Sequence, residues 1–319
     1  MAVSTRQALL QALSAAGGSY VSGQQLAETL GVSRAAVHKA AAALTAQGYA
    51  LEAAPRRGYR LAGGDPFCTE AIGDYPAPIY LYDTLESSNR TAKLLALDGA
   101  PHGTLVLTAH QSAGRGRLGR RFESPAGKGV YCSVLLRPEM PAANAQTATI
   151  SAAVAVCRAV ERAAGKRLDI KWVNDLFYRG KKCCGILTEA AADVETGGVD
   201  YLVVGIGLNL LPPEGGWPEE LAEIAASIFT PGEHVGRCRI AAAIADELLA
   251  LCTALPDTSF MAEYRARNLV PGRDVDVIQN GERRPAHALA ITDDGHLLVR
   301  LPGGGQEELS FGEVSIRFQ

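Results

Sequence analysis

The chain has 319 residues, which is longer than one ordinary domain and predicts two or three. Hydrophobic residues make up 47% of it, enough for a sizeable core. No window approaches the roughly 18 consecutive apolar residues of a membrane span and no secretory pattern opens the sequence, so we expect a cytoplasmic protein with no membrane partner. Its seven cysteines show no CxxC motif and no metal-ligand spacing, which favours free thiols.

The net charge of −3 conceals an asymmetry along the chain. Residues 1–64 carry six basic and two acidic side chains, a net charge of +4, which leaves −7 for the remainder. A basic end on an acidic body predicts a polyanionic partner for that end alone.

The N-terminal segment has the pattern of helices followed by a hairpin. Ser22 and Ser33 are suitable N-caps, and Gly31 would supply the turn between the second and third helices. The turn at residues 55–57, Pro-Arg-Arg, would form a basic wing. The expected helices cover residues 7–15, 23–30 and 34–47, and the expected strands cover residues 50–53 and 58–61.

This helix, turn, helix and wing arrangement predicts DNA binding. A recognition helix needs basic and polar groups near its N-terminal end to reach phosphates and base edges. Arg34 and His38 are four residues apart and share one helix face, while Arg60 adds to the charge of the wing. The alternative is a protein-interaction domain with a solvated basic face. The expected DNA-contacting residues are Gly23, Ser33, Arg34, Ala35, His38, Lys39, Arg56 and Arg57.

The rest of the chain alternates between strand and helix patterns, which implies a mixed sheet. Residues 62–66, Ala-Gly-Gly-Asp-Pro, have linker composition, and a run of short strands after residue 272 fits a small β-barrel. The expected domains are therefore residues 1–64, 65–268 and 269–319. Strands are expected over residues 79–83, 104–109, 129–137, 169–172, 184–189, 201–209, 274–278, 287–291, 296–300 and 307–310. Helices are expected over residues 89–97, 147–164 and 239–255, and tight turns at residues 280–281 and 293–295.

The most informative run covers residues 111–121 and contains three glycines and four arginines. Gly114, Gly116 and Gly119 match the spelling of a dinucleotide-binding fingerprint, but no helix is indicated at the glycines, so we reject that reading. Arginine offers planar multi-donor contacts to phosphate and carboxylate. A flexible loop that closes over an anionic ligand is therefore favoured over a disordered basic surface loop.

Three further clusters carry polar groups at strand ends. Asn174 and Asp175 suit Mg²⁺ or nucleotide hydroxyls because hard cations prefer oxygen ligands, although a plain Asx turn explains the pair equally well. Lys181 and Lys182 precede an expected strand, where one ammonium group suits a reacting phosphate and a solvated hairpin turn is the alternative. Residues 205–209, Gly-Ile-Gly-Leu-Asn, give a weak signal alone.

Together these motifs resemble the bacterial biotin protein ligases that double as biotin operon repressors, and the resemblance covers nearly the whole chain. The matching segments are residues 86–89 (similar to the family's S-T-N turn), 111–121 (G-R-G-R-x-G-R), 171–176 (K-W-P-N-D-L) and 182–187 (K-x-x-G-I-L). Residues 33–36 and 312–317 also resemble that family.

The resemblance implies an α+β protein with a winged helix-turn-helix domain, a central mixed-sheet domain like that of class II synthetases, and a C-terminal SH3-like β-barrel. It implies a ligase that joins biotin to ATP as biotinyl-5′-AMP and then transfers biotin to a lysine of the biotin carboxyl carrier protein of acetyl-CoA carboxylase. ATP and biotin would be substrates, with Mg²⁺ and no tightly bound prosthetic group. A homodimer formed on adenylate binding would bring two N-terminal domains to operator DNA.

Site roles follow from the resemblance by position. The biotin set is Ser87, Ser88, Asn89, Gln111, Arg115, Gly116, Arg117 and Lys182. The ATP set is Arg117, Arg120, Phe122, Asn174, Asp175, Lys182 and Asn209. The catalytic set is Arg115, Arg117, Lys182 and Asp175, of which Asp175 is also the candidate Mg²⁺ ligand.

The sequence departs from the family pattern at Ser88, Val173 and Phe122, where threonine, proline and tryptophan are usual or frequent. We expect Val173 to loosen a turn and Phe122 to offer less stacking area. Arg90, beside the biotin turn, has no explanation from the sequence.

Three alternatives stay open. A transcription factor that senses a ligand without catalysis is disfavoured by the intact Arg115, Arg117 and Lys182. A lipoate ligase is disfavoured by the paired G-R-G-R loop and the K-W-x-N-D segment. A ligase without repressor activity is separated from the main hypothesis only by a DNA-binding measurement.

Overall fold

A computed structural model describes residues 4–141, 145–192, 197–233, 236–253, 258–279, 281–310 and 312–316. Leu255 of an expected helix, Asn280 of an expected turn and Arg317 of the closing motif lie outside these ranges. The chain divides into two compact units, residues 1–74 with 232–239 and residues 75–231 with 240–319. Within the described ranges, no helix is both long and apolar enough to cross a bilayer.

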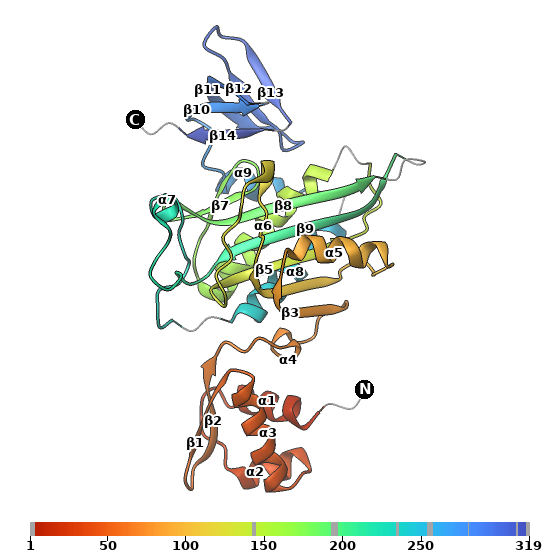
Figure 1. Cartoon of the computed structure of the whole chain (residues 1–319), viewed down its shortest axis with the longest axis vertical. Coiled ribbons are helices and arrows are strands. Elements are labelled where there is room, and N and C mark those ends of the chain that lie inside the picture. The colour runs from red at the N-terminus through yellow and green to blue at the C-terminus, as the bar shows by residue number, and fades with distance from the viewer. Residues whose placement is uncertain are drawn as a thin grey trace. The chain divides into compact units, whose positions relative to one another are not determined.

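The first unit is a helix-turn-helix with a hairpin (Figure 1). The side chains of Ser22 and Ser33 accept hydrogen bonds from the amides of Gln25 and Ala36, which satisfies N–H groups that a helix start leaves free. Gly31 ends the second helix in the left-handed conformation, with φ 63°. The predicted caps and turn are therefore confirmed. The elements are α1 (Thr5–Ala15), α2 (Gly23–Leu30), α3 (Arg34–Ala46), β1 (Tyr49–Ala54) and β2 (Gly58–Gly64), followed by α4 (Thr69–Ile72).

The glycines expected in a linker instead belong to the hairpin. β2 runs through Gly64, which pairs with Tyr49 of β1. A Cβ atom on Gly64 would lie 2.5 Å from the backbone nitrogen of Ala50, so the close approach of the two strands requires glycine here. The composition of this segment reflects hairpin packing rather than a flexible connection.

A seven-stranded sheet forms the centre of the second unit, in the order β3-β4-β5-β9-β8-β7-β6. β3 and β4 are parallel and the other neighbours are antiparallel, so the predicted mixed sheet is confirmed. The strands are β3 (Ile79–Leu85), β4 (Leu105–Gln111), β5 (Gly129–Leu136), β6 (Asp169–Lys171), β7 (Asp175–Tyr178), β8 (Lys181–Ala192) and β9 (Val199–Asn209).

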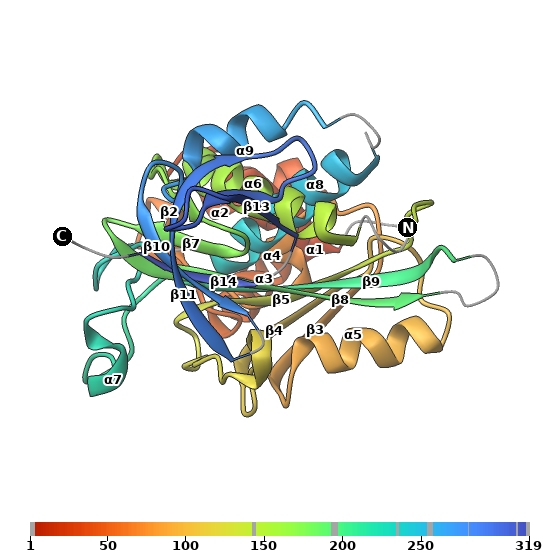
Figure 2. The same ribbon diagram turned by 90° about the horizontal axis from the view of Figure 1, so that it is seen from above.

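Helices cover both faces of this sheet. Figure 2 shows α5 on one face and α6, α8 and α9 on the other. Alanine-rich α6 is buried along most of its length, which lets it lie close to the strands. The bounds are α5 (Ser88–Leu97), α6 (Ala145–Ala164), α7 (Glu219–Ala222), α8 (Arg237–Thr253) and α9 (Met261–Arg267), with one 3₁₀ turn at Arg117–Gly119.

Two expectations about the strands at one edge of the sheet were wrong. Residues 169–178 form two short strands joined by a tight turn, so Asp175 begins a strand instead of following one. Arg179 and Gly180 both have positive φ and make the next turn, which places Lys181 and Lys182 inside β8 rather than before it. Strands of three or four residues are too short to show a period in the sequence.

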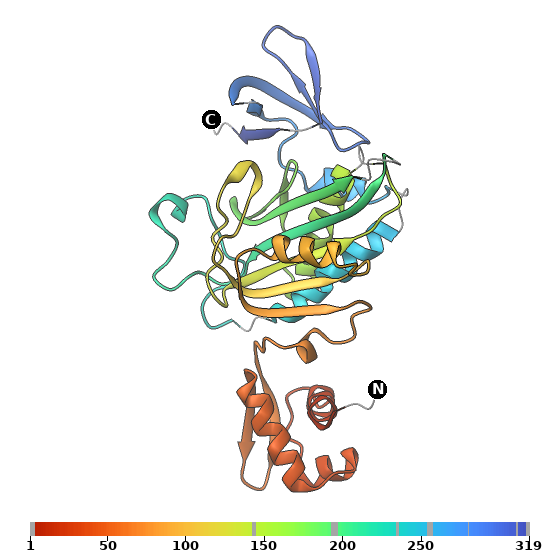
Figure 3. The same ribbon diagram turned by 45° about the vertical axis from the view of Figure 1, so that its right-hand side comes forward.

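The C-terminal region is a five-stranded antiparallel sheet in the order β13-β12-β11-β10-β14 (Figure 3). β14 is a strand that the sequence did not predict, and β11 begins five residues earlier than expected. Between β13 and β14, the two edges, the described residues show no pairing that closes the sheet. The strands are β10 (Asp274–Gln279), β11 (Glu282–Ile291), β12 (Leu297–Arg300), β13 (Gln306–Leu309) and β14 (Glu313–Ile316).

Candidate functional site

One cleft in the second unit gathers most of the residues singled out from the sequence. Its walls are the loop at residues 115–122, the start of α5, the turn between β6 and β7, and the middle of β8 and β9. The predicted site residues that line it are Ser87, Ser88, Asn89, Gln111, Arg115, Gly116, Arg117, Arg120, Phe122, Asn174, Asp175 and Lys182. Asn209 is absent from this lining; it is buried at the end of β9, and its Oδ1 atom has no hydrogen-bond partner among the described residues.

A buried polar cluster forms one end of the cleft. The Ser88 amide donates to Oε1 of Gln111 at 2.8 Å, which joins the start of α5 to the end of β4. Asn89 donates through Nδ2 to the Glu189 carboxylate at 2.8 Å, and the Lys93 ammonium lies 2.6 Å from the same carboxylate. Burial raises the pKa of Glu189, but the hydrogen bonds from Lys93 and Asn89 lower it more, so the carboxylate stays charged.

The arginine loop folds back on itself without starting an α-helix. The Phe122 amide donates to the Gly114 carbonyl at 2.9 Å, and the Gly116 amide donates to the Arg120 carbonyl at 2.7 Å. A Cβ atom on Gly114 would lie 2.5 Å from the Phe122 carbonyl oxygen, so this closure requires glycine. The geometry supports a ligand-facing loop and differs from the helix start of a dinucleotide fingerprint.

The arginines of this loop already have protein acceptors. Arg117 donates to Oδ1 of Asn174 and to the Gly312 carbonyl, both at 2.8 Å. Arg120 pairs with Glu313 at 2.8 Å. These contacts give the guanidinium groups defined positions at the mouth of the cleft.

The turn between β6 and β7 is fixed from both sides. The Tyr264 hydroxyl donates to the Val173 carbonyl at 3.0 Å, and the Trp172 indole N–H donates to the Gly295 carbonyl at 2.9 Å. Asn174 donates through Nδ2 to the Ile186 carbonyl at 2.8 Å. Because this amide bonds across the sheet rather than to its own turn, a plain Asx turn is wrong for Asn174. Hydrogen bonds therefore hold the turn at Val173, and the expected loosening relative to proline stays a prediction.

Two lysines bring positive charge to the floor of the cleft. Lys182 pairs with Asp175 at 2.7 Å. Lys171 also lines the cleft, and its ammonium group has neither a hydrogen bond nor an ion pair within the described part of the chain; the Phe177 ring lies 5.9 Å away. Burial lowers the pKa of Lys171, as expected for an ammonium group partly removed from water.

Glycines of β8 and β9 make room for Phe122. A Cβ atom on Gly207 would lie 2.5 Å from the Phe122 ring, and one on Gly185 would lie 3.5 Å from it. The ring also meets Tyr131 edge-on, with centroids 6.4 Å apart. Phe122 therefore packs directly on the floor of the sheet.

The predicted DNA-contacting surface is exposed on α3. Ser33, Arg34, Ala35, His38 and Lys39 all lie on its outer side, whereas Gly23 is half-buried.

The wing arginines divide into two groups. Arg57 lies over the Tyr20 ring at 4.0 Å, and Arg60 pairs with Glu52 at 2.7 Å. Arg56, at the tip of the hairpin, is exposed.

Comparison with known proteins matches residues 81–209 to the Biotin/lipoate A/B protein ligase family and residues 5–60 to an HTH domain family. The chain is 39% identical over 246 residues to the Bifunctional ligase/repressor BirA of Bacillus subtilis, which covers 74% of each chain. It is 30% identical over 200 residues, or 61% of each chain, to the BirA protein of Escherichia coli. The chain belongs to the BirA family of bifunctional ligase/repressors.

The fold is also that of a solved BirA-related ligase. The biotin protein ligase from Aquifex aeolicus, in complex with biotin and ATP, superposes with a TM-score of 0.63. The likeness covers 76% of this chain and 99% of that one at 24% identity. At this identity the comparison supports the fold of the ligase unit.

Several residues that line the cleft are not among the predicted site residues. Lys171, Trp172 and the Gly-Ile pairs belong to the motifs at residues 171–176, 182–187 and 205–209, so their position beside predicted residues could have identified them. The only sequence signal for Glu313 was the resemblance of residues 312–317 to the family. The missed residues are Leu118, Arg121, Lys171, Trp172, Gly185, Ile186, Leu187, Gly205, Ile206, Gly207 and Glu313.

Proposed function

We propose that this BirA-family chain forms biotinyl-5′-AMP from biotin and ATP and then transfers biotin to a lysine of a biotin carboxyl carrier protein. With biotinyl-5′-AMP as corepressor it would bind its operator and repress transcription. The observation that carries the ligase assignment is a single cleft where the arginine loop, the amide-bearing turn and Lys182 meet. Family membership and the helix-turn-helix support the repressor assignment.

In the first step, a biotin carboxylate oxygen attacks the α-phosphorus of ATP and pyrophosphate leaves. Negative charge accumulates on the phosphate oxygens, and preorganised cations stabilise it most. We assign this role to Arg115, Arg117 and Lys182, with Arg120 nearer the phosphates. No side-chain nucleophile is required.

The remaining residues position the substrates. Ser87, Ser88, Asn89 and Gln111 would hold the ureido head of biotin, with Gly116 letting the loop approach. Phe122 and Asn174 line the cleft and would face the nucleotide. The assignment of Asn209 to the nucleotide stays a prediction, because its side chain is buried outside the lining.

Magnesium fits this site as a partner of the nucleotide. Within the described residues, no three His, Cys, Asp or Glu side chains form a cage for a metal ion. Mg²⁺ is usually held by one or two carboxylates together with phosphates and water, and the oxygen atoms of Asp175 suit it. Bound there, the ion would neutralise phosphate charge.

In the second step, the ε-amine of the carrier lysine attacks the biotinyl carbonyl of the mixed anhydride, and AMP leaves. The lysine loses a proton as the amide forms. We assign to Arg115 and Arg117 the retention of the adenylate until the carrier arrives.

The finer architecture is part of the same proposal. The domains would be residues 1–64, 65–268 and 269–319, the last an SH3-like barrel supported by its five antiparallel strands. A homodimer formed with bound adenylate would present two copies of α3 to two half-sites on DNA.

Mass measurement of a biotin carrier domain incubated with the protein, ATP, Mg²⁺ and biotin tests the ligase proposal. The carrier should gain one biotinyl group, and parallel reactions with lipoate should leave its mass unchanged. A gain with lipoate and none with biotin would overturn the substrate assignment.

A matched lysine pair tests the site. Lys182→Ala should slow adenylate formation by roughly 100-fold, because a positioned cation at the reacting phosphate is lost. Lys181→Ala is the control, since Lys181 contacts the Ala222 carbonyl and Glu223 instead of lining the cleft. Equal rates in both variants would remove Lys182 from the mechanism.

A further inference from the structure

A fully buried hydroxyl lies behind the ligand-facing side chains of the polar cluster. Ser133, in β5, is 0% exposed and does not line the cleft. Its oxygen lies 2.7 Å from Oδ1 of Asn89 and 2.8 Å from Oγ of Ser88. Ser133 therefore connects two residues that do line the cleft.

The direction of the Asn89 amide is set by its other neighbours. Its nitrogen lies 2.8 Å from the Glu189 carboxylate and 3.1 Å from the Leu187 carbonyl, both of which only accept hydrogen bonds. The Asn89 oxygen must then face Ser133. Because a hydroxyl has one proton, Ser133 uses that proton to satisfy Asn89.

The direction of the Gln111 amide is fixed in the same way. The Ser88 backbone N–H, which only donates, lies 2.8 Å from Oε1 of Gln111. The Gln111 nitrogen donates to Oγ of Ser124 at 3.0 Å. The Gln111 oxygen therefore lies on the Ser88 side, 3.2 Å from the Ser88 hydroxyl.

Both protein neighbours of the Ser88 hydroxyl are consequently acceptors. Its proton must turn inward to Ser133, because a proton given to Gln111 would leave the lone pairs of the two serine hydroxyls facing each other at 2.8 Å. A lone pair of Ser88 is then left for the cleft. We propose that Ser133 is a positioning residue that makes Ser88 a hydrogen-bond acceptor, so that this end of the cleft selects a ligand with N–H donors. Lys93 and Glu189 lie at the other end of this series of hydrogen bonds and fix the Asn89 amide.

This inference rests on the proposed function and refines its substrate selectivity. A cyclic urea presents two N–H donors, whereas the dithiolane of lipoate presents none. If Ser88 turned its proton to the cleft, its lone pairs would face those of Ser133 at 2.8 Å, or Ser133 would have to abandon Asn89. The cost of that reversal excludes ligands that offer only acceptors.

Competition between biotin and its cyclic carbamate analogues tests the proposal in the full-length protein. In each of the two analogues one ureido N–H is replaced by a ring oxygen, which changes the shape little. The wild-type protein should prefer biotin in kcat/KM over at least one analogue by roughly 100-fold or more, as expected for a site built around a donor. Ser133→Ala should lower this ratio at least tenfold and raise KM for biotin, with KM for ATP unchanged.

Two further variants keep the test decisive. Ser151→Ala removes another buried hydroxyl, one without a hydrogen-bond partner in the part of the chain that the structure describes, and should leave the ratio at the wild-type value. Glu189→Gln adds an N–H donor beside Asn89 and should shift the ratio in the same direction as Ser133→Ala. It tests the proposal independently if Ser133→Ala fails to fold.

The outcomes separate the two levels of the argument. A wild-type ratio in both Ser133→Ala and Glu189→Gln would overturn the role of Ser133, even if KM for biotin rose. A wild-type protein that turns over no biotin would instead overturn the proposed function.

Discussion

Glycines in β9 determine where two side chains of the cleft lie. A Cβ atom on Gly205 would lie 2.1 Å from Oδ1 of Asn89, and one on Gly207 would lie 2.5 Å from the Phe122 ring. Neither glycine has the positive φ that would demand glycine on conformational grounds. Glycine is required at these two positions because a neighbouring side chain lies too close for a Cβ atom. Alanine at either position would therefore displace that side chain more than it would strain the backbone.

Gly207→Ala should raise KM for ATP by about fivefold, because the Phe122 ring must leave the floor of the cleft and lose about 1 kcal/mol of aromatic contact. Steady-state kinetics with ATP and biotin varied in turn would measure the effect, with KM for biotin expected to stay constant. Gly303→Ala is the control, since a Cβ atom there meets open space. An unchanged KM for ATP would remove Phe122 from the nucleotide site.

About half of the residues that line the cleft were predicted from the sequence, whereas the residues that orient them were not. Arg117 and Lys182 stand in motifs whose glycine and charge spacing indicates an anion site. Ser133 and Glu189 lie 44 and 100 residues away from Asn89 along the chain. Both stand in predicted strands, but no motif marks either of them as a site residue. A buried hydroxyl acquires its role only when the sheet brings its partners together.

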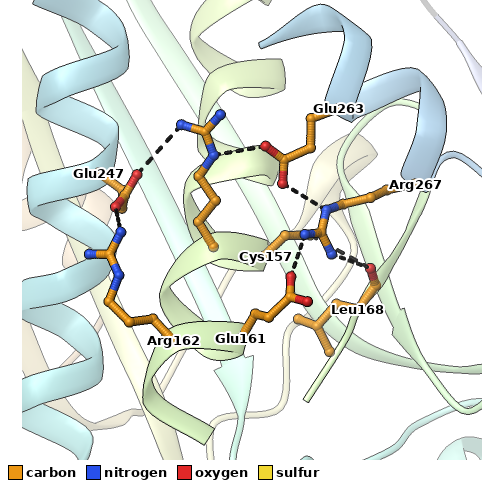
Figure 4. Close-up of polar contacts among 8 residues, drawn as sticks. Cys157, Glu161, Arg162, Leu168, Glu247, Glu263 and Arg267 are labelled. Atoms are coloured by element: carbon orange, nitrogen blue, oxygen red, sulfur yellow. Dashed lines mark hydrogen bonds and ion pairs between the residues drawn. The ribbon is translucent and has the colours of Figure 1, made fainter. Parts of the chain in front are cut away.

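At the scale of elements, α9 joins the helical layer to the turn that carries Asn174. Figure 4 shows Arg267 between Glu161 and Glu263, with its guanidinium also directed to the Leu168 carbonyl. Tyr264 of the same helix bonds to the Val173 carbonyl. A helix of seven residues thus holds one wall of the cleft.

Arg267→Met should destabilise the protein by about 3 kcal/mol, because its side chain is 9% exposed and its loss removes the ion pair of Glu161 and one of the two arginines that pair with Glu263. Arg162→Met, in the same cluster, is the control. The Arg162 side chain is 69% exposed and pairs with Glu247, so its loss should cost under about 1 kcal/mol. Urea unfolding monitored by circular dichroism would compare the free energies of unfolding of the two variants. Equal decreases would show that burial does not determine how much each arginine contributes to stability.

Element prediction succeeded where local chemistry determines structure. The capping serines and Gly31 fixed the N-terminal helices because each acts within four residues. β7, β14 and α9 were missed because they are short and are stabilised by tertiary pairing rather than by a periodic pattern.

At the scale of the whole molecule, charge and chemistry are separated between the two units. The basic segment at residues 1–64 carries the helix-turn-helix, and the acidic remainder carries the ligase cleft. The distribution of charge along the sequence predicted a polyanionic partner for the first of these segments alone. The arrangement implies that salt acts on DNA binding far more than on the reaction.

Operator affinity should fall linearly with salt on logarithmic axes, and Arg34→Ala should reduce the slope by about 1, because one phosphate contact is lost. Arg60→Ala should leave the slope near the wild-type value, since Glu52 already neutralises that guanidinium. Electrophoretic shift titrations with an operator fragment measure both slopes. A slope that Arg34→Ala leaves intact would place α3 away from the DNA backbone.

The paired arginines of the loop have a thermodynamic consequence. Arg115 lies 3.9 Å from Glu86, Arg120 pairs with Glu313, and Arg117 bonds to Asn174. An incoming anion therefore exchanges one acceptor for another and must outcompete groups tethered at high effective concentration. Small free anions such as sulfate should therefore bind weakly. A ligand that also fills the ureido and adenine ends of the cleft displaces several tethered acceptors in one binding event, so affinity depends more on the length of the ligand than on its charge.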